Sequence, residues 1–270
     1  VIDMHDSPSL AFRRKKDSSM AVALNMLAAG EGDAALSAGN TGAWLAGSTF
    51  VVKRIKGIRR PALAPALPTK AGKAILVDCG ANVVCTAEDL LQFAVMGSCY
   101  AHKQLGIASP RVGLINNGAE DTKGTPMYVE AYQLLKTAGE RGDINFVGNI
   151  EGRDIAMGAA DVLVCDGFTG NVVLKTYEGL GLYLVSLLKG IFKKNIFTML
   201  AAALVSGGHK DLKKTMDYKE VGGAPLLGIS KPVITAHGSS DPEAAKSAIR
   251  QACLFVESGF VGEIEKRAAE

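Results

Sequence analysis

The stretch "DVLVCDGFTGNVVLK", residues 161–175, decides the fold class of this chain. Its apolar residues Val162–Cys165 end at Asp166, and a turn of Gly, Thr and Asn then leads into a run that can form a helix. Apolar runs of this kind are typical of parallel strands that are covered on both faces. Because "DAALSAGNTGAWLAG", residues 33–47, has the same shape, we predict an α/β fold with small and polar residues in the turns after its strands.

Short apolar runs alternate with helical patterns along most of the chain. The predicted strands are residues 34–37, 74–77, 111–115, 145–147, 162–165 and 232–235. The predicted helix starts are "DSS" (17–19), the near capping box "TAED" (86–89), "TP" (125–126) and "DP" (241–242). Strands that alternate with helices predict right-handed βαβ units and a mostly parallel sheet.

Composition limits the classes of function that the chain can have. Its 270 residues allow one large α/β domain or two small ones, and the net charge of +3 argues against a nucleic-acid-binding protein. The five cysteines form no C-x-x-C pair, and no signal peptide is visible, so a reducing, cytoplasmic compartment is expected. The longest apolar runs, residues 179–188 and 196–205, are about half of the ~20 residues that span a bilayer.

One segment interrupts the alternation of strands and helices. Residues 177–206 read as two long helical pieces around "KGIFKKN" and are rich in Leu, Phe, Ile and Ala. We predict that residues 177–207 form a protruding hydrophobic helical arm within a single domain that covers residues 1–270. Such an arm can lie in the headgroup region of an anionic membrane, or it can be a helix pair at a dimer interface.

Five predicted strands end in loops of similar composition. The loops are "SAGNTGA" (37–43), "DCGAN" (78–82), "NNGAEDTKG" (116–124), "DGFTGN" (166–171) and "AHGSSDP" (236–242). In a parallel sheet such loops emerge at the carboxyl edge, where the N–H groups and the dipole of each helix start attract anions. One such turn is usually only a helix cap, but five together favour a phosphate site. No dinucleotide fingerprint follows a strand and no P-loop motif is present, which argues against nucleotide cofactors.

Lys123 and Asn171 are the predicted catalytic residues. Lys123 is the only lysine inside these loops and can hold phosphate or polarise a carbonyl, unless it is a solvated surface lysine. Asn171 can donate an amide N–H to a developing oxyanion, unless it only caps a helix. The predicted phosphate-binding residues are Asn40, Thr41, Gly42, Asn82, Thr169, Gly170, His237 and Ser239.

The other reactive residue types are expected to have structural roles. Cys165 lies in an apolar strand, so we predict that it belongs to the core and is not a nucleophile. The acidic residues of the loops are expected to cap turns. The four histidines and scattered cysteines lack the spacing of metal ligands, so no metal or other cofactor is expected.

Nine motifs together resemble one bacterial family over about residues 10–258. They are "RRKKDSSM", "SAGNTGA", "KGIRRPALAPALPT", "DCGAN", "FAVMGSCYA", "PRVGLINNGAEDTKG", "FVGNIEGRDI", "DGFTGNVVLKTYEG" and "ITAHGSSD". They are similar to motifs of the acyl-acyl carrier protein:phosphate acyltransferases of phospholipid synthesis. The resemblance implies a three-layer α/β/α fold, shared with phosphotransacetylases and with isocitrate and isopropylmalate dehydrogenases.

The resemblance also implies the reaction and the partners. Inorganic phosphate would attack the thioester of acyl-acyl carrier protein directly and give acyl phosphate, because a thiolate is already a good leaving group. A homodimer is expected, with its hydrophobic tip on the inner face of the cytoplasmic membrane near the downstream glycerol-3-phosphate acyltransferase. The arm can also receive an acyl chain or an acidic carrier protein. The family begins with a strand and a Gly-Gly-Asp loop that this sequence does not contain, so one strand and an outer part of the site are expected to be missing.

Three other functions are compatible with parts of this pattern. A phosphotransacetylase-type enzyme would use acyl-coenzyme A, whereas a carrier-protein donor would need a basic docking surface such as "RRKK" (13–16) or Arg54–Arg60. A non-catalytic membrane-associated scaffold would not need five polar loops. A dehydrogenase would need the nucleotide fingerprint that is absent from this sequence.

Overall fold

The larger of two sheets contains four of the six predicted strands. In this computed structural model, which describes all residues except 4, 205–222, 237, 239–240 and 270, its strand order is β3-β4-β7-β5-β6. The bounds are β3 (Ala66–Thr69), β4 (Gly72–Val77), β7 (Val162–Val164), β5 (Arg111–Asn116) and β6 (Asn145–Glu151). β4, β7, β5 and β6 run parallel, and β3 pairs antiparallel to β4. The carboxyl ends of the four parallel strands therefore lie at one edge.

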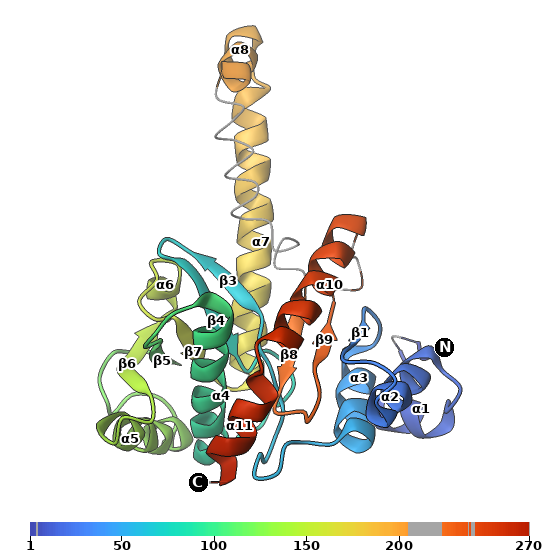
Figure 1. Cartoon of the computed structure of the whole chain (residues 1–270). Helices are drawn as coiled ribbons and strands as arrows, with labels where there is room; N and C mark the ends of the chain where they lie inside the picture. Colours follow the sequence, from blue (N-terminus) through green and yellow to red (C-terminus); the bar gives the residue numbers. More distant parts are fainter. Residues whose placement is uncertain (4, 205–222, 237, 239–240, 270) are drawn as a thin grey trace.

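Helices cover both faces of this sheet (Figure 1). Along β4, Ile75 and Val77 enter one hydrophobic core while Leu76 enters the other, because side chains alternate across a strand. The first core is closed mainly by α4 (Ala87–Leu105) and α5 (Pro126–Glu140), and the second by α6 (Gly152–Ile155) and the first turns of α7 (Gly167–Phe192). This is the three-layer α/β/α arrangement that was predicted.

A second, smaller sheet has the order β1-β9-β8-β2. Its strands are β1 (Ala35–Ser37), β9 (Val233–Thr235), β8 (Ala224–Leu227) and β2 (Ala62–Leu63), and only β1 and β9 pair in parallel. The helical elements α1 (Pro8–Arg14), α2 (Ser19–Ala29), α3 (Thr41–Gly47) and the π-helical turn η1 (Ser48–Val52) precede β2. Trp44 of α3 is buried in this part, where its indole N–H donates to the carbonyl of Ile234 at 3.1 Å.

All six predicted strands are present, but they do not belong to one sheet as expected. β1 and β9 lie in the smaller sheet, so the five polar loops divide into three from the larger sheet and two from the smaller one. The chain passes between the sheets at residues 62–69, where β2 pairs with β8 and β3 pairs with β4. β2, β3 and β8 were not predicted, and all three take part in antiparallel pairs.

The helix α7 projects far beyond the sheets and has α8 (Ile196–Leu204) at its distal end (Figure 1). Val173, Leu174 and Tyr177 in its first turns pack against the core, whereas many later apolar side chains are exposed. The predicted arm thus continues a helix that begins at Gly167, and its residues 205–207 lie outside the described residues. No helix in the described part of the chain combines the length and apolar character needed to cross a bilayer.

The chain closes with α10 (Pro242–Glu257) and α11 (Phe260–Ala269). Phe255 and Phe260 from these helices meet Tyr100 of α4 in edge-to-face contacts, with ring centroids 5.7 and 5.8 Å apart. Such aromatic pairs add about 0.5–1.5 kcal/mol beyond the burial of their area. They fix the end of the chain onto α4, on the face of the larger sheet opposite the start of α7.

Candidate active site

The loops after β4 and β7 lie directly against each other. The backbone N–H of Gly167 donates to the carbonyl oxygen of Asn82 at 2.7 Å. A Cβ on Gly167 would lie 2.7 Å from that same oxygen, and a Cβ on Gly170 would collide with the carbonyl oxygen of Asp78. Glycine at these two positions therefore allows α7 to begin in direct contact with the loop after β4.

β4 and β7 are neighbours whose following helices lie on opposite faces of the sheet. α4 follows β4 and packs on one face, whereas α7 follows β7 and packs on the other. Connections that diverge in this way define the topological switch point of an open α/β sheet, where ligands usually bind at the carboxyl ends of the strands. The switch point thus lies between the loops 78–86 and 166–171.

Asp78 holds the loop after β4 in shape. Its carboxyl group is fully buried and accepts hydrogen bonds from the backbone N–H groups of Leu63, Cys79 and Asn82 at 2.8, 2.7 and 2.6 Å. The side-chain amide of Asn82 donates a further bond at 3.1 Å. Burial raises the pKa of Asp78, and the hydrogen bonds it accepts oppose that rise. This group has a structural role because its oxygens face the backbone.

Asp166 connects the start of α7 to α5. Its carboxylate caps α7 by accepting from the backbone N–H of Thr169 at 2.9 Å, and it accepts from the Tyr128 hydroxyl at 2.6 Å. Burial, and next the bond to Asp166, raise the pKa of the Tyr128 hydroxyl. The sequence did not indicate this contact, because nothing in a helical pattern shows that a tyrosine will reach another strand-end loop.

Three of the predicted phosphate-binding side chains already make hydrogen bonds within the protein. Asn40 caps α3 by accepting from the N–H of Ala43 at 2.9 Å, and its amide donates to the carbonyl of Asp3 at 3.1 Å. The Asn82 amide donates to the carbonyl of Pro61 at 2.7 Å as well as to Asp78. The Thr169 hydroxyl donates to the Asp166 carboxylate at 2.9 Å. These side chains hold the loops in place, and their contact with phosphate stays a prediction.

The other predicted phosphate-binding residues lie in three places. Thr41 and Gly42 form the first turn of α3 in the smaller sheet, apart from the loops of the larger sheet. Gly170 lies in the first turn of α7, against Asp78. His237 and Ser239 lie outside the described residues.

Asn171 differs from the predicted site residues Asn40 and Asn82 because its side-chain amide makes no hydrogen bond within the described part of the chain. The residue is exposed in the first turns of α7, and among the described residues its side chain has no hydrogen-bond partner. A Cβ on Gly80 would lie 3.8 Å from the Cβ of Asn171, so this side chain stands beside the loop after β4. Gly80 was not among the predicted site residues, although the quoted loop "DCGAN" contains it. An amide in this position can donate to a group bound at the switch point.

Lys123 lies in the exposed loop between β5 and α5. Its Nζ is 3.8 Å from the carboxylate of Glu120, and this exposed pair contributes little to stability. The helix that follows, α5, begins at Pro126 without a side-chain cap, whereas α3, α4, α7 and α10 each have one. An uncapped helix start three residues after a lysine can attract an anion.

The buried cysteines near the switch point are poor nucleophiles. Burial raises the pKa of Cys79 and of Cys85 to about 12, and it raises that of Cys165 well above its ordinary value. These thiols are therefore protonated near pH 7, and only a thiolate attacks readily. Cys165 is fully buried, which confirms its prediction as a core residue.

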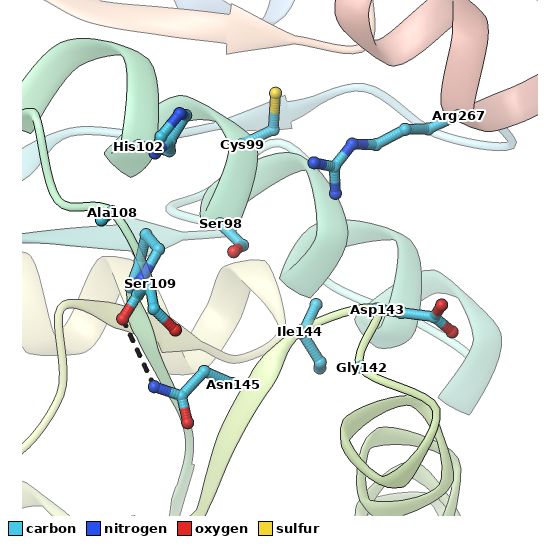
Figure 2. Close-up of a pocket in the computed structure, with 11 residues that line it drawn as sticks. Ser98, Cys99, His102, Ala108, Ser109, Gly142, Asp143, Ile144, Asn145 and Arg267 are labelled. Atoms are coloured by element: carbon cyan, nitrogen blue, oxygen red, sulfur yellow. Dashed lines mark hydrogen bonds between the residues drawn. The ribbon is translucent and has the colours of Figure 1, made fainter.

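A cavity of about 470 Å³ lies at the opposite edge of the larger sheet (Figure 2). It is lined by residues that precede β5 and β6, together with Ser98, Cys99 and His102 of α4 and Arg267 of α11. Figure 2 shows the Asn145 amide bonded to the carbonyl of Ser109 among the lining residues. None of the five polar loops contributes to this cavity, so the geometry of the switch point, and not the size of a cavity, identifies the candidate site.

Comparisons with known proteins identify close relatives of the chain. The family model of the fatty acid synthesis proteins matches residues 1–263. The phosphate acyltransferase of Thermoanaerobacterium thermosaccharolyticum is 52% identical over 266 residues, covering 98% of this chain and 79% of that protein. The phosphate acyltransferase of Clostridium botulinum is 50% identical over 265 residues, covering 98% and 78%.

Solved structures agree with the fold at much lower sequence identity. A phosphotransacetylase from Streptococcus pyogenes has a TM-score of 0.61 at 18% identity, covering 92% of this chain and 69% of that one. A 4-hydroxythreonine-4-phosphate dehydrogenase from Klebsiella pneumoniae has a TM-score of 0.53 at 12% identity, covering 95% and 73%. These likenesses support the α/β/α architecture, shared by transferases and dehydrogenases.

Proposed function

Because the chain belongs to the phosphate acyltransferase family, whose members transfer acyl groups to phosphate for phospholipid synthesis, we propose that it performs this reaction at the switch point between β4 and β7. A phosphate oxygen attacks the thioester carbon and forms the new C–O bond. The electron pair of the carbonyl moves to its oxygen, then returns as the C–S bond breaks and the thiolate leaves. No covalent bond to the protein forms, in keeping with the raised pKa values of Cys79 and Cys85.

Asn171 donates its amide N–H to the oxyanion of the tetrahedral intermediate. One observation carries this assignment: the Asn171 amide is uncommitted beside Gly80, whereas the amides of Asn40 and Asn82 are bonded within the protein. A fixed donor aimed at the developing charge typically contributes about 100- to 1,000-fold in turnover.

Lys123 binds the phosphate at the start of α5. The start of α7 is less suited to this task, because the backbone N–H and the hydroxyl of Thr169 already donate to the Asp166 carboxylate. The start of α5 has no such cap, and Lys123 adds a positive charge two residues before Thr125. Phosphate at α5 and the acyl carbonyl at α7 would then meet across the switch point, since Tyr128 ties the two helices together.

Two alanine variants with matched controls test these roles. Asn171→Ala and Lys123→Ala are each expected to lower turnover about 100-fold or more in a phosphate-dependent thioester-loss assay. Thr176→Ala on α7 and Lys136→Ala on α5 remove exposed side chains from the same helices and are expected to leave turnover within twofold. If both site variants keep turnover within threefold of the unmodified chain while their folding is intact, the two roles are wrong.

We further propose that the acyl donor is acyl-acyl carrier protein. The resemblance of the motifs to carrier-protein-dependent enzymes supports this choice over acyl-coenzyme A. Arg59 and Arg60 are about half exposed and offer a basic surface, although Asp89 lies 3.4 and 3.5 Å from them. A kcat/KM for acyl-coenzyme A that equals or exceeds that for acyl-acyl carrier protein would instead favour the phosphotransacetylase-type donor.

The arm is proposed to be a contact surface, on a membrane or between two subunits of a homodimer. Leu187 and Ile191 on α7 and Phe197 on α8 are 45–78% exposed, and lysines 189, 193 and 194 accompany them. Apolar residues with adjacent lysines suit the headgroup region of anionic lipid, on the inner face of the cytoplasmic membrane near the downstream glycerol-3-phosphate acyltransferase. Co-sedimentation with anionic vesicles and sedimentation velocity of Leu187→Asp and Ile191→Asp variants would separate the two surfaces.

A further inference from the structure

Four large apolar side chains are exposed to solvent in the loop after β4 and in the first turns of α7, which contain Asn171. Val83 and Val84 lie in the loop after β4, Phe168 and Val172 lie in the first turns of α7, and all four are 50–76% exposed. We name this set the apolar rim. Single exposed apolar residues are common on protein surfaces, but several grouped together mark a binding surface.

One backbone hydrogen bond connects the two halves of the apolar rim. Val83 follows Asn82 and Phe168 follows Gly167, and the backbone bond from Gly167 to Asn82 is 2.7 Å long. Phe168 and Val172 are four residues apart on α7, so their side chains lie on the same face of the helix. The rim is therefore continuous from the loop after β4 to the second turn of α7.

The rim rests on a rigid support. The Asp78 carboxyl group binds the backbone of the loop below Val83 and Val84, and the Asn82 amide fixes the loop to the carbonyl of Pro61. On the other side, Asp166 fixes the start of α7. These bonds fix the backbone on both sides of the rim, while the four rim side chains stay exposed.

We propose that the apolar rim binds the first carbons of the donor's fatty acyl chain. The inference rests on the proposed function, in which the Asn171 amide contacts the carbonyl oxygen of the thioester. The methylenes bonded to the reacting carbon must lie on the surface that surrounds this amide. Phe168 lies three residues before Asn171 on α7 and Val172 lies one residue after it. The loop that contains Val83 and Val84 is bonded to the start of the same helix.

The substrate of the proposed reaction has an alkyl chain that can occupy the rim. Both the thioester substrate and the acyl phosphate product have an alkyl chain attached at the point where the bonds change, so this chain stays on the rim during the transfer. Each methylene removed from water favours binding by about fourfold. The rim therefore makes the enzyme prefer acyl groups long enough to cover it over an acetyl group.

Serine variants of the rim test this inference through chain-length preference. Val84→Ser and Phe168→Ser remove apolar surface from exposed positions, so they are expected to fold normally. The measured quantity is kcat/KM with palmitoyl- and with acetyl-acyl carrier protein, because an acetyl group has no methylene to place on the rim. If each substitution removes the contact of roughly two methylenes, the palmitoyl-to-acetyl ratio falls about 15-fold. Met157→Ser, at a similarly exposed apolar site outside the rim, is expected to keep the ratio within twofold.

Three other outcomes would change the interpretation of the rim or of Asn171. If both donors lose activity equally and the ratio stays constant, the rim does not bind the acyl chain. A constant ratio with a smaller assembly in sedimentation velocity would show instead that a second copy of the chain covers the rim. If Asn171→Ala keeps full turnover while the rim variants still change the ratio, the oxyanion donor is wrong and the acyl subsite remains supported.

Discussion

Replacing Gly170 with alanine should both destabilise the protein and slow the reaction. A Cβ at this position would collide with the carbonyl oxygen of Asp78 and lie 3.1 Å from the sulfur of Cys165. The oxygen belongs to the backbone of a loop held by hydrogen bonds, so it cannot move aside easily. Overpacking of this kind costs about 1–3 kcal/mol, and the better helix propensity of alanine returns about 1 kcal/mol. Because the oxygen belongs to fixed backbone, the upper part of that range applies, about 2–3 kcal/mol, and we expect a net loss of about 1–2 kcal/mol.

Gly179 provides the matched control on the same helix. A Cβ there would meet no atom within 4 Å, so Gly179→Ala gains helix propensity without a collision. For a chain of this size about 1 kcal/mol changes Tm by roughly 2–4 °C. Thermal unfolding should thus show a Tm about 2–8 °C lower for Gly170→Ala and slightly higher for Gly179→Ala.

Turnover separates a local effect from a general one. Gly170→Ala is expected to displace Asn171 from Gly80, and a small misplacement of an oriented group can cost about 100-fold in rate. Gly179→Ala should leave turnover unchanged. If Gly170→Ala unfolds at the same temperature as the unmodified protein, the close approach of α7 to the loop after β4 is refuted.

Two further predictions concern ionisable groups. Burial alone would raise the pKa of Asp161, but the hydrogen bonds and charge of Arg111 lower it below its usual 3.8. The stability that this pair adds is therefore present above about pH 4 and is lost as pH falls through the lowered pKa. Asp161→Asn should make Tm less steeply dependent on pH between pH 5 and pH 3, and equal slopes would contradict this. Iodoacetamide at pH 8 should modify the exposed Cys253 and spare the four buried cysteines, so intact mass spectrometry that shows several adducts on folded protein would contradict their burial.

The strands and the fold class could be predicted because they depend on local sequence patterns. A bare apolar run such as Val162–Cys165 indicates a strand covered on both faces wherever it lies in the chain, and Thr86 with Asp89 indicates a helix start. The division into two sheets could not be predicted in this way. It depends on which strands pair, and β1 pairs with β9 from the other end of the chain.

The roles of individual site residues were harder to predict for the same physical reason. Asn82 and Asn171 have the same amide group and lie in loops of similar composition. The Asn82 amide donates hydrogen bonds to the carbonyl of Pro61 and to Asp78, whereas Asn171 lies beside Gly80, which has no side chain. Such a difference arises from contacts between segments that are distant in sequence, and no local pattern records it.

The same contacts explain why so many polar residues occur at the carboxyl edge although few can meet the substrate. Asp78 and Asp166 accept from backbone N–H groups in the loops after β4 and β7, where strand pairing stops and unpaired buried N–H groups would cost free energy. The Asn82 amide donates to the carbonyl of Pro61. Once these groups are satisfied, the loops are rigid, and an uncommitted amide such as that of Asn171 needs no reorganisation to meet a developing charge. Substituting Asp78 or Asn82 should therefore reduce turnover indirectly, together with stability, whereas substituting Asn171 should reduce turnover at constant stability.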